Sequence, residues 1–234
     1  MKLVVCSLLA LAGCSSLSNN DDGVAVLEVQ GGVNPFLEPG VPLQLRGVAR
    51  NSAGDSVDIP IVWRASDTTL VRLDSLTGVI EAKAITGSVQ VQASTRGKSP
   101  IATDPFALTF TLTAKAESLE VVLDSLDVLT DATTSPPLQA MLFGVDAAPV
   151  AGRPVQFRII EPAYGTGDTP GVQFSTFRIA DSTQTSSLGI ANMFLTRVTD
   201  QPTPARVVVE VRAFHATGAP ILGSGQQIVV RFEP

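Results

Sequence analysis

The stretch that decides the fold runs from residue 63 to residue 91. It reads Trp63-Arg64-Ala65-Ser66-Asp67, then a turn over 74–78, then Val79-Ile80-Glu81-Ala82 and Gly87-Ser88-Val89-Gln90-Val91. Short apolar or alternating runs that end in Gly, Asp or Ser are typical of antiparallel strands joined by tight turns. A Trp buries about 200 Å² and can anchor a sandwich core without a disulfide, and Gly78 and Gly87 suit turn positions with φ > 0. This stretch therefore predicts a β-sandwich.

The same pattern continues outward from Val24 to the end of the chain, with Gly, Pro, Asn or Asp at intervals of about 8–12 residues and no convincing helix. Alternation with period two marks the residues expected to face a core. In the first half they are Leu27/Val29, Leu43/Leu45, Ile61/Trp63, Val79/Ile80, Val89/Val91/Ala93 and Phe106/Leu108/Phe110/Leu112. In the second half they are Leu119/Val121/Leu123, Leu138/Ala140/Leu142, Val155/Phe157/Ile159, Val207/Val209/Val211/Ala213 and Ile228/Val230/Phe232.

Residues 24–115 resemble the bacterial immunoglobulin-like group 2 domains. The resemblance rests on Trp63, the Ser66-Asp67 turn, the Gly-x-Ile-x-Ala hairpin at 78–82 and the strand led by Gly87. It implies an immunoglobulin-like sandwich with Trp63 in its core.

Residues 118–234 resemble the invasin-like group 1 domains. Residues 149–157 match the Pro-Val-x-Gly-x-x-Val-x-Phe element, and Gly189-Ile190-Ala191 matches a later strand start, whereas the segment Glu161–Gly171 departs from the pattern. We therefore expect two tandem immunoglobulin-like β-sandwiches that form weak structural repeats. Only Lys115–Glu117 separates them, and so short a joint favours a semi-rigid rod.

The first 13 residues are interpreted as a lipoprotein signal peptide. Residues 3–12 are apolar and uncharged, and a helix of ten residues rises about 15 Å, too little to span a bilayer. The run ends in Leu11, Ala12, Gly13 and Cys14, which resembles the bacterial lipobox. That resemblance implies cleavage before Cys14 and its modification by diacylglyceryl and N-acyl chains such as palmitate. The alternative is an ordinary secretory signal with an incidental Cys.

A lipidated Cys14 would leave the mature chain without a free thiol, since Cys6 is removed with the signal. The polar segment 14–23 reads as the lipidated Cys and a flexible tether. Ser15 stands where an Asp tends to retain lipoproteins at the inner membrane, so the family pattern indicates the outer membrane.

Composition excludes several classes of function. The net charge of −6 and the pI of about 4.7 argue against a nucleic-acid binder, and Lys and Arg are scattered singly along the sequence. With one His and two Cys, little is available for a metal site or nucleophilic catalysis, and no phosphate-binding or dinucleotide motif occurs. We expect no enzyme, no cofactor, no metal and no small-molecule substrate.

His215 is the only candidate general base. It follows Phe214 and precedes Ala216-Thr217-Gly218, so we interpret it as a solvent-facing residue entering a turn. A hydrolase requires that it adjoin a Ser and a carboxylate.

Carboxylates at three places are candidates for Ca²⁺, but none has the spacing of a calcium loop, and polar turns are the alternative. They are Asp55 with Asp58, Asp67 with Asp74, and Asp124/Asp127/Asp131.

The candidate contact loop is Glu161–Gly171, with Glu161, Tyr164 and Asp168 as its site residues. Tyr164 is the ring expected to be exposed, because Trp63, Phe157, Phe194 and Phe232 fall in the core or on strand patterns. The alternative is a long mobile hairpin.

The sequence thus predicts a lipid-anchored cell-envelope protein whose sandwiches serve adhesion, spacing or binding of an unknown protein partner without catalysis. The alternative is an assembly lipoprotein of a larger envelope complex, such as a secretion or filament apparatus.

Overall fold

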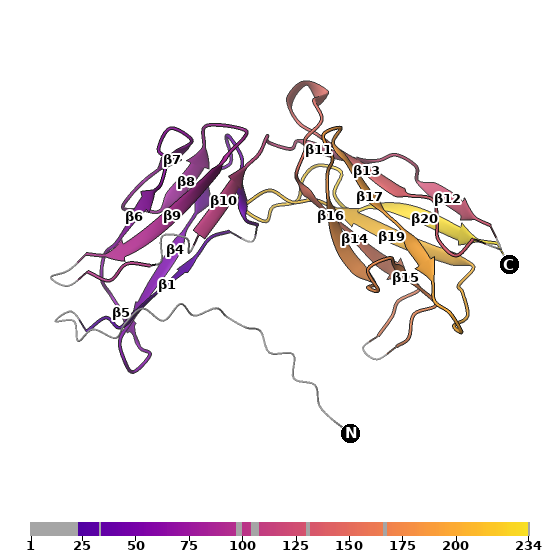
Figure 1. Cartoon of the computed structure of the whole chain (residues 1–234), viewed down its shortest axis with the longest axis horizontal. Coiled ribbons are helices and arrows are strands. Elements are labelled where there is room, and N and C mark those ends of the chain that lie inside the picture. The colour runs from indigo at the N-terminus through magenta and orange to yellow at the C-terminus, as the bar shows by residue number, and fades with distance from the viewer. Residues whose placement is uncertain are drawn as a thin grey trace.

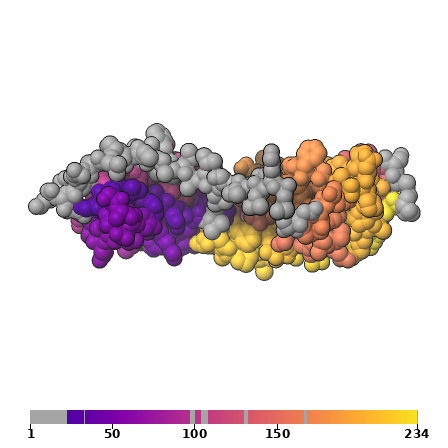
Figure 2. Space-filling model, turned by 90° about the horizontal axis from the view of Figure 1, so that it is seen from below, coloured from indigo at the N-terminus to yellow at the C-terminus, as the bar shows by residue number. Residues whose placement is uncertain are grey.

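The computed structural model describes residues 23–32, 34–96, 100–103, 108–129, 132–165 and 168–233. Within these ranges the chain is built of β-strands, and its helical content is one 3₁₀ turn, η1 (Val145–Ala147). The strands form two β-sandwiches that lie end to end (Figures 1 and 2). The predicted all-β class with two tandem sandwiches is confirmed.

The first sandwich has two layers. One holds β1 (Val26–Gln30), β3 (Leu43–Gln44), β4 (Arg46–Arg50), β5 (Ser56–Val57), β7 (Val71–Leu73) and β8 (Val79–Ala82), paired as β1-β4-β5 and β3-β8-β7. The other holds β2 (Phe36–Leu37), β10 (Leu108–Leu112), β9 (Ser88–Thr95) and β6 (Ile61–Ala65), in that order. β3 and β4 follow each other directly along the chain, so together they take the place of strand B in an immunoglobulin domain. With that assignment the two layers match the A-B-E-D and C-F-G sheets of the domain.

Trp63 lies in the core of this sandwich, with 4% of its surface exposed. It belongs to a buried cluster of apolar residues that includes Leu43, Ile80 and Val91. The predicted inward faces are buried or half-buried where the structure describes them, and Phe106 lies outside the described residues. Gly78 and Gly87 have φ of 74° and 116°, as their turn positions predict.

The second sandwich repeats this plan. One layer holds β11 (Ser118–Val121), β13 (Leu138–Phe143), β17 (Ile190–Met193), β18 (Leu195–Arg197) and β15 (Val172–Phe174), paired as β11-β13-β17 and β15-β18. The other has the order β12 (Ser125–Val128), β20 (Gln226–Phe232), β19 (Arg206–Arg212), β14 (Pro154–Glu161) and β16 (Ala180–Gln184). β16 is the departure from the plan, because it adds an outer strand beside β14.

The predicted core residues of this sandwich are buried, except that Val121 is half-buried and Leu123 is exposed. Leu138, Ala140 and Leu142 are fully buried, as are Val155 and Phe157. Leu123 is 55% exposed, so its assignment to the core was wrong. β11 ends at Val121 and the chain bends there, which breaks the alternation before it reaches Leu123.

In both sandwiches the first strand crosses between layers. β1 pairs with β4 and then β2 pairs in parallel with β10, just as β11 pairs with β13 and then β12 pairs in parallel with β20. Glu38 directly follows β2, and its carboxylate there meets Arg153 of the second sandwich.

Candidate functional site: the joint and an arginine-lined groove

A buried ion pair joins the two sandwiches. Nη1 of Arg153, just before β14, lies 2.6 Å from Oε1 of Glu38, and their side chains are 1% and 0% exposed. Removing charges from water is costly unless their remaining hydrogen-bonding groups are also satisfied. Neighbouring groups form hydrogen bonds with both side chains.

The Glu38 carboxylate is held by three further groups beyond the first sandwich. The backbone N–H of Ala116 donates to Oε1 at 3.2 Å, the N–H of Ala216 donates to Oε2 at 3.0 Å, and Nδ1 of His215 lies 3.2 Å from Oε2. Burial alone would raise the pKa of Glu38, but the charge and hydrogen bond of Arg153 and the two N–H donors outweigh burial and lower it. Glu38 is therefore an anion at neutral pH.

The guanidinium of Arg153 contacts both sandwiches. Its Nη2 donates to the carbonyl of Phe214 at 2.7 Å, and Nη1 also approaches the carbonyl of Ala114 at 3.4 Å. Its carbon lies 3.9 Å from the centre of the Phe36 ring in the first sandwich, a cation–π contact. The Nε of Arg153 has no hydrogen-bond partner among the described residues.

The segment between the sandwiches belongs to this network. Ala116 is fully buried and donates to Glu38, so the segment predicted as a short linker is packed inside the joint. Across the joint, the hydroxyl of Thr113 donates to the carbonyl of Ala151 at 3.4 Å. At Gly32 an added Cβ would lie 2.7 Å from the carbonyl oxygen of Ala216, so the two sandwiches approach too closely there for a side chain.

His215 occupies a different environment from the one predicted. Its side chain is 19% exposed and directed at Glu38, and its carbonyl accepts from the Asn34 amide at 3.0 Å. The turn at His215 was predicted correctly. The prediction that His215 faces solvent was wrong, because the turn packs against the first sandwich. In the described part of the chain no serine hydroxyl is hydrogen-bonded to His215, and the Glu38 carboxylate is already engaged by Arg153. The arrangement is a structural network rather than a nucleophile–base–acid triad.

The candidate contact loop is only partly described, since 166 and 167 lie outside the described residues. Glu161 is exposed at the end of β14 and pairs with Arg206. Tyr164 is half-buried and packs against the second core, so the ring expected to be exposed is largely covered. Asp168 accepts a hydrogen bond from the N–H of Gly165 at 2.5 Å, which closes the loop on itself.

Two of the carboxylates considered for Ca²⁺, Asp67 and Asp74, serve turns, whereas Asp127 lies on β12 and pairs with Arg231 at 3.6 Å. Asp67 accepts from the N–H and hydroxyl of Thr69, and Asp74 accepts from the N–H of Leu76 and Thr77. Asp131 lies outside the described residues. Over the ranges that the structure describes, no three His, Cys, Asp or Glu residues gather as a metal site would require.

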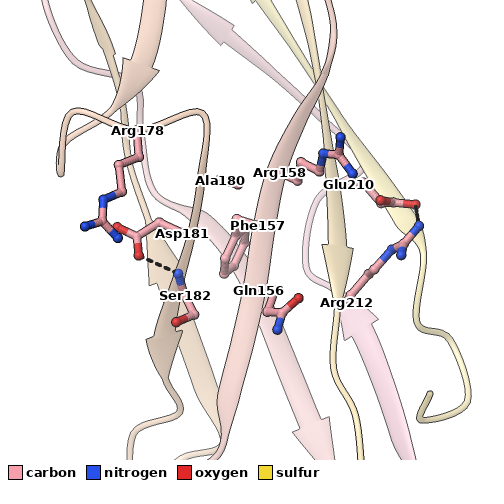
Figure 3. Close-up of a pocket in the computed structure, with 9 residues that line it drawn as sticks. All are labelled: Gln156, Phe157, Arg158, Arg178, Ala180, Asp181, Ser182, Glu210 and Arg212. Atoms are coloured by element: carbon pink, nitrogen blue, oxygen red, sulfur yellow. Dashed lines mark hydrogen bonds and ion pairs between the residues drawn. The ribbon is translucent and has the colours of Figure 1, made fainter. Parts of the chain in front are cut away.

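A groove that no local sequence pattern predicts lies on the outer face of the second sandwich. Its volume is about 340 Å³, and β14, β16 and β19 form it together with the segment before β16 (Figure 3). Three arginines line it, Arg158, Arg178 and Arg212, together with Glu210 and Asp181. Lys and Arg appeared scattered in the sequence, but pairing of Arg158 with Glu210 across β14 and β19 brings distant charges together.

A second feature missed is Phe177, which is 82% exposed and has a φ of 65°. It occupies the turn between β15 and β16, where its N–H donates to the carbonyl of Phe174 at 2.8 Å. A large side chain in the left-handed region is unusual, and nothing local in the sequence marks the position.

The lipobox residues Leu11, Ala12, Gly13 and Cys14 lie outside the described residues, as does the predicted tether up to residue 22. Among the described residues, no helix has the length and apolar character needed to cross a bilayer.

No family model and no curated protein sequence matches this chain. Solved structures that resemble it include domains 4 and 5 of the S-layer protein SbsC, at 11% identity and a TM-score of 0.31, covering 90% of this chain and 99% of that one. The Yersinia pseudotuberculosis adhesin InvE is 12% identical with a TM-score of 0.39, covering 92% of this chain and 62% of that one. The D00-D0 domain of intimin is 15% identical with a TM-score of 0.33, and the match covers 89% of this chain and 100% of that one. All three are distant neighbours, and the immunoglobulin-like fold is established by the strand order described above.

Proposed function

We propose that this protein is a lipid-anchored component of a bacterial cell envelope that carries two immunoglobulin-like sandwiches as one non-catalytic binding unit. The observation that carries the proposal is the buried Glu38–Arg153 pair, which makes the two sandwiches a single body. A body of two sandwiches attached through a lipid at Cys14 holds its far surfaces away from a membrane, as a spacer or adhesion module requires.

The anchor is supported by the sequence Leu11-Ala12-Gly13-Cys14 after an uncharged apolar run. Two or three acyl chains, at about 0.8 kcal/mol per buried methylene, hold a protein far more firmly than a single myristoyl chain. Ser15 after the Cys favours the outer membrane over the inner one.

The experiment compares Cys14→Ala with Cys6→Ala, two cysteine substitutions only eight positions apart. We expect the Cys14→Ala protein to lose palmitate incorporation and to move from the washed membrane fraction to the soluble fraction. The Cys6→Ala protein should keep both properties, because Cys6 is removed with the signal. If Cys14→Ala stays in washed membranes, or if Cys6→Ala loses palmitate, the proposed anchor is wrong.

A further inference from the structure

The groove on the second sandwich carries a positive charge on a chain that is negative as a whole. The chain has a formal net charge of −6, yet three guanidinium groups and only two carboxylates line this one depression. In Figure 3, Arg178 and Asp181 lie on one side of Phe157, and Arg158, Glu210 and Arg212 lie on the other. The local sign of charge is therefore opposite to that of the protein.

Both carboxylates in the groove are already engaged. Glu210 pairs with Arg212 at 2.8 Å and its side chain is only 14% exposed. Asp181 accepts from the N–H of Ser182 at 2.7 Å, and a hydrogen bond from Thr176, that N–H and the charge of Arg178 lower its pKa. Glu210 is paired with Arg212, and Asp181 keeps its negative charge near Arg178, so the groove lining carries one positive charge in excess.

Two guanidinium groups make no direct ion pair within the described residues. Arg158 lies opposite Glu210 in the strand register, but within the described residues neither Arg158 nor Arg178 has a carboxylate oxygen within 4.0 Å. Both side chains are exposed. A planar guanidinium presents paired N–H groups that match the two oxygens of a carboxylate.

The turn that leads into Arg178 adds an apolar element. Phe177 precedes Arg178 directly and exposes 82% of its surface, in a backbone conformation that costs energy for a residue with a side chain. Aromatic residues and arginine are the residues enriched in protein–protein contacts. An exposed, strained Phe beside an arginine-lined groove indicates a partner that covers both.

We propose that this groove binds an acidic segment of a partner polypeptide, with carboxylates on Arg158 and Arg178 and an apolar side chain against Phe177. The inference rests on the proposed binding function and names its partner's chemistry. A polypeptide fits better than an acidic sugar, because Phe157 inside the groove is fully buried and the exposed ring of Phe177 lies outside the groove lining, so no ring is available for a sugar to stack on within the groove.

The test uses the full chain in a non-ionic detergent and two fluorescein-labelled probes. One is hexaglutamate, and the other is the same peptide with two glutamates replaced by leucine. Hexaglutamine is the uncharged control, and fluorescence anisotropy is measured at low and at physiological salt.

We expect both acidic peptides to bind, hexaglutamine not to bind, and Arg158→Gln to weaken binding about tenfold. Arg72→Gln, an exposed arginine on the first sandwich, is the matched control and should leave binding unchanged. Phe177→Ala should weaken only the leucine-containing peptide. The melting temperature of Arg158→Gln checks that the variant is folded.

The proposal is overturned if hexaglutamate binds no better than hexaglutamine, or if Arg158→Gln and Arg72→Gln weaken it equally. It is also overturned if an oligogalacturonate of equal charge displaces hexaglutamate more strongly than unlabelled hexaglutamate does, because the ligand would then be a sugar. Peptide binding in detergent does not depend on the lipid anchor. A negative binding result would therefore leave the proposed anchor at Cys14 standing, and a negative Cys14→Ala result would leave the proposed peptide site standing.

Discussion

Arg153 and Glu38 stand 115 positions apart in the chain and meet at 2.6 Å, with both side chains closed off from solvent. Each belongs to a different sandwich, so their contact exists only when both sandwiches are folded and docked. Breaking a buried pair by removing one partner costs about 3–5 kcal/mol, because an uncompensated charge remains.

Arg153→Met should therefore uncouple the two sandwiches. We expect calorimetry to show one cooperative transition for the native protein and two separate, lower transitions for the variant. Arg64→Met, an exposed arginine on β6, is the control and should shift unfolding by less than about 0.5 kcal/mol. A single unchanged transition in Arg153→Met would show that the pair does not hold the joint.

The double variant Glu38→Leu/Arg153→Met should be more stable than the sum of the single losses predicts, since neither charge is then stranded. The same calorimetric traces measure this coupling. Strict additivity of the two single effects would contradict a direct interaction.

Acid should weaken the joint through Glu38. Its folded pKa is lowered below the ordinary value of 4.5, so its carboxylate stabilises the fold at pH values above 4.5. That contribution is lost as the pH falls through the lowered folded value. The melting-temperature difference between the native protein and Glu38→Gln should be constant from pH 7 to about 4.5 and shrink at lower pH.

Other carboxylates with lowered pKa, such as Asp67 and Asp74, are present in both proteins and cancel in this difference. If the melting-temperature difference between the native protein and Glu38→Gln were the same at every pH, the ionised carboxylate of Glu38 would not be the stabilising group.

Trp63→Ala should destabilise the first sandwich by about 3–5 kcal/mol through the cavity it leaves. Trp63 is the single tryptophan of the chain and is 4% exposed. Calorimetry and circular dichroism are the measurements, because the substitution removes the fluorophore. A loss below about 1 kcal/mol would place Trp63 outside the core.

Gly78→Ala tests the contact between a turn and that tryptophan. A Cβ at Gly78 would lie 2.7 Å from Nε1 of Trp63, whereas a Cβ at Gly40 would meet nothing within 4 Å. The two glycines have nearly equal φ, 74° and 73°, so the backbone penalty of about 1–2 kcal/mol is shared. Urea unfolding should therefore show a larger loss of unfolding free energy for Gly78→Ala than for Gly40→Ala. Equal losses in the two variants would mean that the Trp63 side chain moves aside without an energetic cost.

Sequence patterns located the strands because alternation reports burial on one face, as at Leu138, Ala140 and Leu142. They also located the turn at His215, but not what covers it. The covering groups, Asn34 and Glu38, lie 181 and 177 positions away, and no local pattern encodes such a pairing. The same holds for the groove, where Arg158 and Arg212 are neighbours only through the pairing of β14 with β19.

The groups that enclose Glu38 come from three separated parts of the chain, and the last of them, the N–H of Ala216, follows Glu38 by 178 positions. During synthesis this carboxylate therefore stays hydrated until the chain has emerged as far as Ala216, and the docked form is reached only after both sandwiches have folded. A truncated product that stops before His215 leaves Glu38 short of two of its partners, His215 and the N–H of Ala216, so such shortened chains are the ones most open to proteolysis at the boundary between the sandwiches.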